Sequence, residues 1–516
     1  MILGTGSHVG KSLLTTALCR IFAQEGYRVA PFKSQNMSLN SAATIEGLEI
    51  GRAQALQAEA AGIAASVDMN PILLKPCGDR SSQIVVHGKI WGKLTASEYH
   101  QRRVQELLPA VEASYERLAE AHDVIVLEGA GSPAEINLKQ HDIVNMRMAE
   151  LAGAACLLVG DIDRGGVFAA LLGTVMLLAS EEQARIRGFV VNKFRGDLAL
   201  LAPGITMMEQ RLDKPCLGVV PHLHGLLLEE EDSLALPDLF AEQVGWNAGA
   251  GLARPLRIVV VALPSFSNFT DFDSIRTESS VVLRFVRDVP GLAGADVVVL
   301  PGSKQTVEDL QWMRHTGLAD AVIAHARDGL LVGICGGMQM LGEEIADPLH
   351  VEHVGVVAGL ALLPLRTEMH ARKTTRIAAG TTLIARLFGQ AMPALCVAGY
   401  EIHVGKTQLA EGTSAFARLK TPHSQDAEFT DGCISADSRV FGTYLHGLFD
   451  VDEFRHAFIA AARAFHGLTP AMQLDAWKEK REQSFDRLAD TLRDALDLPR
   501  LFAWVGLTYR GAAARR

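Results

Sequence analysis

Short runs of apolar and β-branched residues alternate with helical patterns through most of the chain. Val124–Leu127, Ala155–Val159 and Phe189–Val191 are apolar at every position, which is typical of strands that are buried on both faces of a sheet. Polar or glycine-containing residues follow each run, and a stretch with helical spacing comes next. This alternation predicts a mostly parallel sheet with helices on both faces.

The alternation stops between about Glu229 and Pro255 and then begins again. An acidic cluster at 229–232 leads into a glycine-rich segment, and this composition is typical of a linker. Beyond it, three apolar runs predict the core strands of a second α/β unit. These runs are Leu256–Leu263, Val297–Leu300 and Leu330–Ile334.

The last part of the chain, after Asp450, has a helical pattern. We expect one apolar stripe of this tail to pack on the body of the protein. The fold class is therefore predicted as α/β, with two parallel-sheet domains and a helical C-terminal tail. The stripe consists of Phe485, Leu488, Leu492, Ala495 and Leu496. The predicted boundaries are 1–232 for the first domain, 233–255 for the linker, 256–450 for the second domain and 451–516 for the tail.

The composition is that of an ordinary globular protein, with 48% hydrophobic and 21% charged residues over 516 positions. The net charge of −10 argues against a general attraction to nucleic acid or anionic lipid. Seven cysteines lie singly, without a CxxC pair, which fits a reducing cytoplasm better than a disulfide framework or a zinc site. No signal-peptide pattern opens the chain, and the longest helix-like uncharged run, Gly165–Ser180, is shorter than the roughly 20 residues that span a bilayer. We therefore expect a cytoplasmic protein that binds neither nucleic acid nor a membrane.

The first candidate site is a glycine-rich loop at the start of the chain, followed by a helical stretch. Backbone N–H groups of such a loop bind phosphate oxygens, while Lys11 adds a positive charge and Ser12 a hydroxyl that can ligate Mg²⁺. Five residues, rather than the usual four, separate Gly4 from Gly10, a spacing that resembles the dethiobiotin synthetase group of P-loop proteins. A glycine-rich turn without a ligand is the alternative. The candidate ATP-binding residues of the loop are Gly4, Thr5, Gly6, Gly10, Lys11 and Ser12.

Polar residues follow three of the predicted strands and should lie at one edge of the first sheet. Lys33 follows a predicted strand at Arg28–Ala30 and can reach the nucleotide from there. Glu128, opposite Ser12, is a natural Mg²⁺ ligand. The alternative for Lys33 is a surface lysine without a ligand, and the alternative for Glu128 is an acid that caps a helix. A third strand end carries residues that would bind metal, phosphate or substrate, or form an internal ion pair. These are Asp161, Asp163 and Arg164.

The second candidate site is a cysteine between a predicted strand and a predicted helix. Cys335 is followed by Gly336 and Gly337, and small neighbours permit the strained turn of a nucleophile elbow. The adjacent helix N-terminus favours a thiolate. A buried structural role is the alternative for any cysteine, and it is what we expect for the other six. These are Cys19, Cys77, Cys156, Cys216, Cys396 and Cys433.

A cysteine nucleophile needs a proton carrier and an oxyanion hole. His446 follows a β-like segment of the same unit, but His403 has a similar setting, so spacing alone leaves the two nearly equal. Backbone N–H groups at Gly302 and Gly336 are the candidates for binding the oxyanion.

Several long stretches resemble the glutamine-hydrolysing cobyric acid synthase family of cobalamin biosynthesis. The resemblance covers nearly the whole chain and implies a dethiobiotin-synthetase-like ATPase domain joined to a class I glutamine amidotransferase domain. It also implies ATP and Mg²⁺ as cofactors, with a corrinoid carboxylate, L-glutamine and ATP as small-molecule partners. A homodimer is a candidate assembly that the residues themselves do not determine. The stretches that carry it are 31–40, 49–54, 69–76, 133–138, 161–168, 192–197 and 267–273.

The resemblance also assigns residue roles. The segment Val440–Gly447 matches the family's catalytic-histidine motif, so the implied pair is Cys335 with His446. Most class I amidotransferases have a glutamate two residues beyond this histidine, whereas here the position is Leu448, and the group that orients the imidazole is not identified. The resemblance further places Asn192 against adenine. Gln35 and Asn36 belong to a loop that resembles the family's own version and are candidate substrate contacts.

The family's reaction is the amidation of the b, d, e and g carboxylates of adenosylcobyrinic acid a,c-diamide. Ammonia must stay unprotonated on its way to the carboxylate, so we expect a sheltered passage. The nearest alternative is the related a,c-diamide synthase, although the loop after Lys33 argues against it. An alternative of another class is a P-loop switch ATPase with a non-catalytic amidotransferase-like domain, which would not need an intact cysteine elbow.

Overall fold

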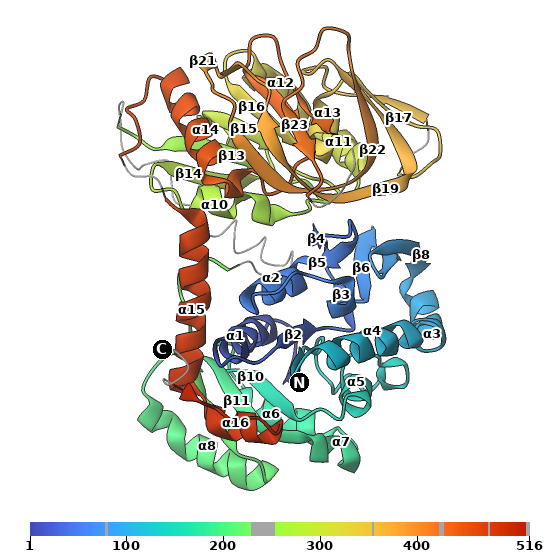
Figure 1. The fold of residues 1–516 in the computed structure, drawn as a ribbon, viewed down its shortest axis with the longest axis vertical. Helices are drawn as coiled ribbons and strands as arrows, with labels where there is room; N and C mark the ends of the chain where they lie inside the picture. Colours follow the sequence, from blue (N-terminus) through green and yellow to red (C-terminus); the bar gives the residue numbers. More distant parts are fainter. Residues whose placement is uncertain (78–80, 229–252, 353–354, 423–427, 473–474, 512–516) are drawn as a thin grey trace. The chain divides into compact units, whose positions relative to one another are not determined.

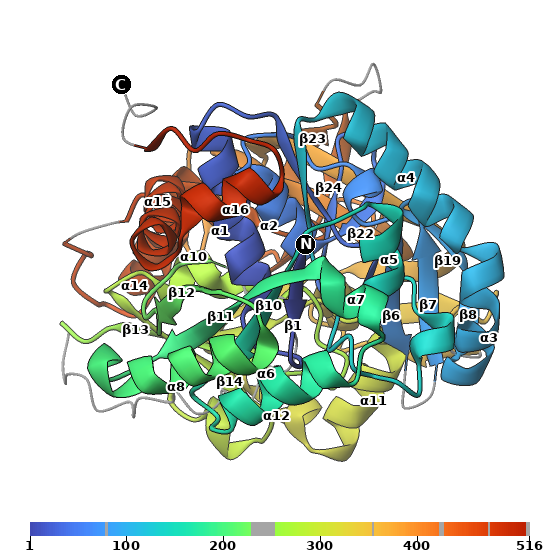
Figure 2. The same cartoon turned by 90° about the horizontal axis from the view of Figure 1, so that it is seen from below.

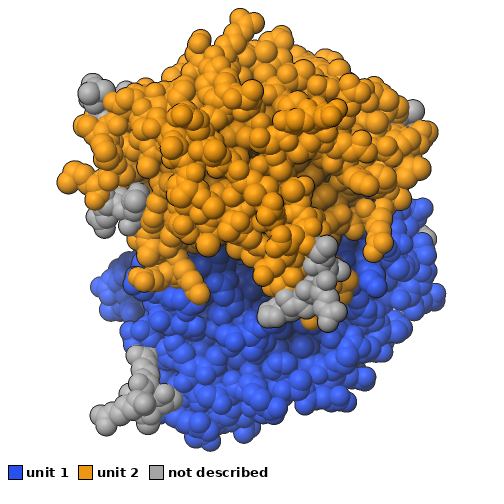
Figure 3. All heavy atoms as spheres, turned by 45° about the horizontal axis from the view of Figure 1, so that its top comes forward, with its two compact units in different colours: residues 1–38, 49–231, 481–516 blue, residues 39–48, 232–480 orange. Residues whose placement is uncertain are grey.

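The computed structural model describes residues 1–77, 81–228, 253–352, 355–422, 428–472 and 475–511. These fall into two compact units, shown in different colours in Figure 3. Unit 1 combines 1–38, 49–231 and 481–516, and unit 2 combines 39–48 and 232–480. Each unit contains a largely parallel sheet, so the predicted α/β fold class is confirmed. The predicted linker at 233–255 lies almost entirely outside the described residues.

The main sheet of unit 1 is parallel throughout (Figure 1). A parallel bridge between Ile2 and Glu128 joins its two groups of strands. Because the strands run in one direction, their carboxyl ends share one edge, where the polar residues of the first candidate site lie. In spatial order the strands are β2 (Val29–Phe32), β9 (Val124–Leu127), β1 (Ile2–Gly4), β10 (Cys156–Asp161), β11 (Ile186–Phe194) and β12 (Cys216–Pro221).

Apolar clusters cover both faces of this sheet. Neighbouring residues of β10 point to opposite faces, so Val159 packs in one cluster and Leu158 in the other. A smaller sheet adds strands β3 (Gln35–Met37), β6 (Ile72–Cys77), β7 (Ser81–Val86) and β8 (Lys89–Thr95). The remaining elements are β5 (Glu49–Gly51), α1 (Lys11–Gln24), α2 (Arg52–Ala60), α3 (Ala96–Glu106), α4 (Leu108–Ala121), α5 (Met146–Leu151), α6 (Val167–Met176), α7 (Ser180–Arg185) and α8 (Leu198–Leu212).

The C-terminal helices α15 (Trp477–Ala495) and α16 (Leu498–Trp504) return to unit 1, beside α1 (Figures 1 and 2). Four members of the predicted stripe are buried in the unit 1 core, and Ala495 packs against it, so the expected packing is confirmed. Arg20 of α1 also forms ion pairs with Glu482 and Asp486. Helix α14 (Asp452–Phe465) belongs to unit 2. The segment that the sequence analysis treated as one tail is thus divided between the two units.

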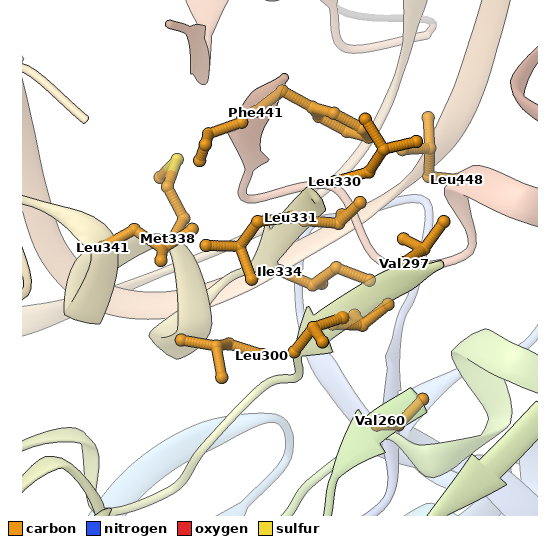
Figure 4. Close-up of a cluster of buried hydrophobic side chains, with 14 of the residues drawn as sticks. Val260, Val297, Leu300, Leu330, Leu331, Ile334, Met338, Leu341, Phe441 and Leu448 are labelled. Atoms are coloured by element: carbon orange, nitrogen blue, oxygen red, sulfur yellow. The ribbon is translucent and has the colours of Figure 1, made fainter. Parts of the chain in front are cut away.

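The main sheet of unit 2 is parallel except for its last strand. Its core is packed with valine, leucine and isoleucine side chains, as Figure 4 shows around Leu331 and Ile334. In spatial order its strands are β14 (Val281–Val286), β13 (Leu256–Val261), β15 (Val297–Leu300), β16 (Leu330–Ile334), β26 (Val440–Thr443) and β25 (Cys433–Ile434). The other helices among the described residues of the unit are α10 (Asp273–Arg276), α11 (Thr306–His315), α12 (Leu318–Ala326) and α13 (Gly336–Leu341).

A second, mostly antiparallel sheet in unit 2 was not predicted. Its centre is the long pair β19 (Leu365–Thr382) and β22 (Cys396–Leu409). The other strands of unit 2 are β4 (Ser41–Ala43), β17 (Glu344–Asp347), β18 (Gly355–Ala358), β20 (Arg386–Leu387), β21 (Gln390–Ala391), β23 (Ala417–Lys420) and β24 (Phe429–Asp431). Within the described part of the chain, no helix has the length and apolar character needed to cross a bilayer.

Two candidate functional sites

The glycine-rich loop of unit 1 connects β1 to α1. Gly10 precedes the helix with φ +97°, and a Cβ there would lie 2.2 Å from Nδ2 of Asn192. A Cβ at Gly4 would lie 2.6 Å from a Val9 methyl carbon, whereas Gly6 has open space around it. The backbone of Thr5 donates to the carbonyl of Val159 on β10 at 2.9 Å. Glycine is therefore required at positions 4 and 10 by close packing of the loop.

Lys11 bends back over the loop. Its Nζ donates to the carbonyl of Gly6 at 2.8 Å and to that of Gly131 at 3.1 Å. The side chain is buried, so its ammonium group is held at the loop rather than in bulk solvent. This arrangement suits a cation that neutralises a phosphate.

The carboxylate of Glu128 joins several side chains at the carboxyl edge of the sheet. Ser12 Oγ donates to its Oε1 at 2.8 Å, and Lys33 Nζ forms an ion pair with the same oxygen at 3.0 Å. Gln57 Nε2 donates to the other oxygen, Oε2, at 2.6 Å. The structure thus brings Ser12, Lys33 and Glu128 together, and it adds Gln57, which sequence reasoning missed.

The pair of Ser12 and Glu128 is chemically suited to Mg²⁺. The ion prefers oxygen ligands, usually one or two carboxylates with phosphate and water oxygens completing an octahedron. No group of three or more histidine, cysteine or acidic side chains among the described residues forms a dedicated metal cage. A site that takes its remaining ligands from a nucleotide fits this donor set.

Charged residues at the ends of β10 and β11 pair with one another. Asp161 lies 3.0 Å from Lys193 Nζ and 4.0 Å from Arg164 Nε, and Asp163 lies 3.3 Å from Arg195. For Asp161, Asp163 and Arg164, the sequence left open either a ligand-binding role or internal ion pairs. The contacts in the structure are ion pairs. The nearby Asn192 is buried, and its Nδ2 donates to the Val9 carbonyl of the loop at 2.8 Å.

Gln35 and Asn36 lie on β3 in the smaller sheet of unit 1. Gln35 Oε1 accepts a hydrogen bond from the Tyr99 hydroxyl at 2.6 Å. The amide nitrogen of Asn36 donates to Oε1 of Gln54 at 3.1 Å, and Asn36 is buried. Asn36 thus reaches helix α2 through Gln54, and Gln57 of the same helix contacts Glu128 at the phosphate end of the site.

In unit 2, Cys335 lies at the sharp turn from β16 to α13. Its backbone has φ 52° and ψ −111°, a sparsely populated conformation for a residue with a side chain. A Cβ at Gly337 would lie 2.0 Å from the Leu300 carbonyl oxygen, so the turn also needs glycine there. The Cys335 amide donates to the Thr443 carbonyl of β26 at 2.8 Å. This is the geometry of a nucleophile elbow.

His446 follows β26 and its imidazole contacts both Asp271 and Cys335. Its Nδ1 lies 2.7 Å from Asp271 Oδ2, and both side chains are almost fully buried. Burial alone lowers the pKa of His446, but the Asp271 carboxylate, with a smaller contribution from Cys335, raises it from 6.5 to about 10. The imidazole is therefore protonated at neutral pH and lies beside the thiol.

Asp271 is a site residue that sequence reasoning did not identify. It lies on the short 3₁₀ segment Phe269–Phe272, and its second oxygen accepts the Gly447 amide at 2.9 Å. The only available signal was its place in the stretch 267–273 that carries the family resemblance. Leu448, by contrast, packs in the apolar core that Figure 4 shows, so position 448 takes no part in orienting the histidine.

His403 does not contact the thiol. Its Nδ1 lies 2.7 Å from the Gly405 carbonyl, and its ring stacks on Tyr444 at a centroid distance of 3.7 Å. The thiol instead approaches the carbonyl of the preceding residue, Ile402, at 3.7 Å. The structure therefore brings His446, and not His403, to Cys335.

Both candidate oxyanion glycines adjoin this pair. A Cβ at Gly302 would lie 3.0 Å from His446 Cε1, and a Cβ at Gly336 would lie 3.0 Å from the Ser303 amide nitrogen. Backbone N–H groups are thus near the elbow, where a tetrahedral intermediate would carry its negative charge.

Two family models match the chain, each over the main part of one unit. The CobQ/CobB/MinD/ParA nucleotide binding domain matches residues 1–234. The CobB/CobQ-like glutamine amidotransferase domain matches residues 257–454. The first candidate site thus lies in a nucleotide-binding domain, and the second in an amidotransferase domain.

The chain is similar to curated proteins over nearly its whole length. A cobyric acid synthase of Moorella thermoacetica is 47% identical over 509 residues, which cover 98% of this chain and 97% of the relative. A cobyric acid synthase of Pelotomaculum thermopropionicum is 46% identical, with coverage of 98% and 96%. One of Clostridium botulinum strain 657 is 44% identical, with coverage of 98% and 99%.

Proposed function

Because the chain belongs to the cobyric acid synthase family, we propose that it uses ATP and glutamine to amidate carboxylates of a corrinoid. The proposed reaction is the conversion of the b, d, e and g carboxylates of adenosylcobyrinic acid a,c-diamide to carboxamides. The observation that carries the proposal is the juxtaposition of Cys335, His446 and Asp271 in the unit with amidotransferase similarity. A glycine-rich loop with Lys11, Ser12 and Glu128 in the nucleotide-binding unit supports the ATP-dependent half.

The role of unit 1 is to make a carboxylate reactive toward ammonia. A free carboxylate resists attack because its carbonyl carbon is a poor electrophile and its leaving group would be oxide. Transfer of the ATP γ-phosphoryl group to a carboxylate oxygen gives an acyl phosphate and ADP. Lys11 and Lys33 neutralise the charge that spreads over the transferred group. Ser12 and Glu128 would hold Mg²⁺, which supplies further charge neutralisation when bound.

Ammonia then replaces phosphate on the acyl carbon. The nitrogen lone pair forms the C–N bond, the C–O bond to phosphate breaks, and its electron pair leaves with phosphate. The nitrogen sheds one proton, which a phosphate oxygen takes up. The products are a carboxamide and inorganic phosphate.

The role of unit 2 is to release ammonia from glutamine. The Cys335 thiolate attacks the side-chain amide carbon, and backbone N–H groups near Gly302 and Gly336 bind the oxyanion. The C–N bond then breaks as His446 gives its proton to the departing nitrogen. Water cleaves the resulting thioester with His446 as base, which releases glutamate. Asp271 holds the imidazole in the orientation that both proton transfers need.

The assembly and compartment complete the proposal. We place the enzyme in the cytoplasm, which the isolated cysteines favour, and we propose a homodimer as the assembly to be tested. Light scattering of the purified chain tests the dimer, and fractionation of the host cells tests the compartment.

Two variants test the division of labour. Cys335→Ala should lose corrinoid amidation with glutamine and keep it with ammonium salts, because only ammonia release needs the thiol. Lys11→Ala should lose amidation with both nitrogen sources, because activation precedes the attack of either. Wild-type rates with glutamine in Cys335→Ala, or retained synthesis in Lys11→Ala, would overturn the corresponding half.

A further inference from the structure

Helix α2 carries two glutamines that have no part in the function proposed so far. Gln54 and Gln57 are both fully buried. Because they are three positions apart, they lie on the same face of the helix. That face is turned toward Glu128 at one end and toward Asn36 at the other.

The amide of Gln57 has a fixed orientation. A carboxylate only accepts hydrogen bonds, so the group 2.6 Å from Glu128 Oε2 must be the Gln57 nitrogen. The Gln57 oxygen, Oε1, therefore points elsewhere. It is buried and has no hydrogen-bond partner among the described residues.

The amide of Gln54 is fixed by a relay of hydrogen bonds. The Met37 backbone amide donates to Asn36 Oδ1 at 2.9 Å, so the other end of the Asn36 side chain is its donor. This Nδ2 donates to Gln54 Oε1 at 3.1 Å. The Gln54 nitrogen, Nε2, is therefore the end that remains. It too is buried and has no partner in the described part of the chain.

Helix α2 thus carries one unsatisfied donor, on Gln54, and one unsatisfied acceptor, on Gln57, whose nitrogen contacts Glu128 of the candidate phosphate site. Buried polar groups without partners destabilise a fold, so they are uncommon unless a ligand uses them. A group that accepts at one atom and donates at the next complements this pair. A carboxyl carbon that is gaining nitrogen has this pattern, with an oxygen that accepts and an N–H that donates.

We propose that Gln54 and Gln57 bind the reacting carboxyl group while it becomes a carboxamide. Gln54 Nε2 donates to the carbonyl oxygen of the acyl phosphate, and Gln57 Oε1 accepts an N–H of the incoming ammonia. This inference rests on the proposed amidation, and it assigns Gln54 and Gln57 as the residues that position the reacting groups.

The glutamines take no proton in this step. An amide oxygen is too weak a base, so the proton that leaves nitrogen still goes to phosphate. Gln57 instead aims the nitrogen lone pair at the carbon. Gln57 also holds Glu128, which couples the place of attack to the phosphate end of the site. Orientation of this kind contributes to the rate of attack and not to the preceding phosphoryl transfer.

The test compares ATP use with amide formation. Gln54→Met and Gln57→Met keep the side-chain length and remove the hydrogen bonds. With ammonium chloride as nitrogen source, we expect amide formation in Gln54→Met to fall by about tenfold or more, while corrinoid-dependent ATP hydrolysis stays within about threefold of wild type. The acyl phosphate is then lost to water, so more ATP is hydrolysed for each amide formed. Gln57→Met should show the same rise in this ratio, with an added loss of ATP turnover through Glu128.

Further variants separate this role from a structural one. Gln54→Glu keeps an oxygen that accepts from Asn36 and replaces the free N–H donor by a carboxylate oxygen, which repels the carbonyl oxygen of the acyl phosphate. It should therefore raise the same ratio, and it tests the inference if Gln54→Met does not fold. Gln24→Met, on α1 of the same unit, should leave the ratio unchanged. An unchanged ratio in both Gln54 variants, or an equal loss of ATP hydrolysis and amidation, would overturn the inference. Absence of corrinoid-dependent ATP hydrolysis in the wild type would instead refute the proposed function itself.

Discussion

The Asp271 carboxylate makes two contacts that together determine how His446 is oriented. One oxygen receives the Gly447 amide and the other receives His446 Nδ1, at 2.9 and 2.7 Å. A cysteine–histidine pair commonly has a third group that orients the base, and unrelated folds supply this group from different places in the chain. Here it comes from the 3₁₀ segment Phe269–Phe272, far upstream of the histidine, because Leu448 occupies the usual position and is buried in the core.

Replacement of Asp271 by asparagine should impair glutamine use selectively. The Gly447 amide would keep the asparagine oxygen as its acceptor, so the asparagine nitrogen would face His446 Nδ1. A donor at that place forces the proton onto the other ring nitrogen, and the imidazole can no longer accept one from the thiol. We expect a loss on the order of 10⁴-fold in glutaminase turnover, measured as glutamate release, with ammonia-dependent amidation unchanged. Asp437→Asn, at a surface contact with Arg439, is the control and should retain activity.

The charge of His446 predicts a pH dependence of stability. Its folded-state pKa of about 10 lies above the ordinary value of 6.5, so the folded protein binds the proton more tightly. This contribution to stability is complete below pH 6.5 and is lost as the pH rises to about 10. The free energy of unfolding of the wild type, relative to His446→Gln, should therefore fall across this window. Urea titrations at several pH values measure the difference, and parallel pH profiles for the two proteins would contradict the expectation.

Sequence reasoning reached the site residues that carry a local signal. Lys11 and Ser12 follow a recognisable glycine pattern, and Cys335 is flanked by the small residues of an elbow. The sequence around Asp271 and Gln57 has no comparable pattern. Their contacts with His446 and Glu128 join segments distant in sequence, so they exist only once the sheets have formed. The choice of His446 over His403 rested on family resemblance for the same reason.

At the scale of elements, the loop before α1 has a conformation that only glycine allows. Gly10→Ala would place a methyl group against the Asn192 amide in a backbone region unfavourable to alanine. We expect a loss of about 1–3 kcal/mol in the free energy of unfolding of unit 1, together with weaker ATP binding. Gly173→Ala is the matched control, because Gly173 lies inside α6 with open space around it. That variant should be neutral or stabilising by up to about 1 kcal/mol, and similar losses in both variants would contradict the prediction.

Strands buried on both faces were the most predictable elements. The predicted runs at 124–127, 297–300 and 330–334 coincide with β9, β15 and β16, because a continuous apolar run is the direct signature of such a strand. The long pair β19 and β22 was missed. Only part of each strand is buried, and charged and threonine residues interrupt the alternation, so the period-two signal is weak.

At the scale of the whole molecule, segments that lie at opposite ends of the sequence pack in the same unit. The sequence gives two α/β regions followed by a helical tail, yet the residues from Arg481 onward belong to the first unit. The apolar stripe predicted that this helix is buried, but periodicity does not identify the partner surface. The partner is an apolar face of unit 1 that includes Leu14 and Phe22 of α1.

The return of the C-terminal helix predicts that unit 1 depends on it for stability. Phe485 is fully buried among the α1 side chains, under Arg20. Phe485→Ala removes that apolar surface and leaves a cavity, which should cost about 3–5 kcal/mol. The temperature at which nucleotide binding is lost should fall, while that for glutaminase activity should change little, since Cys335 and His446 belong to the other unit.

Leu200→Ala provides the control for this experiment. Leu200 is a large apolar residue of the same unit that is 83% exposed, so its truncation should leave both temperatures near those of the wild type. Equal losses of nucleotide binding and glutaminase activity in Phe485→Ala would mean that the two units unfold together. An unchanged nucleotide-binding temperature would mean that α15 does not support unit 1. A selective loss would show that the last residues of the chain stabilise the first domain, so that the ATP-dependent half depends on both ends of the sequence.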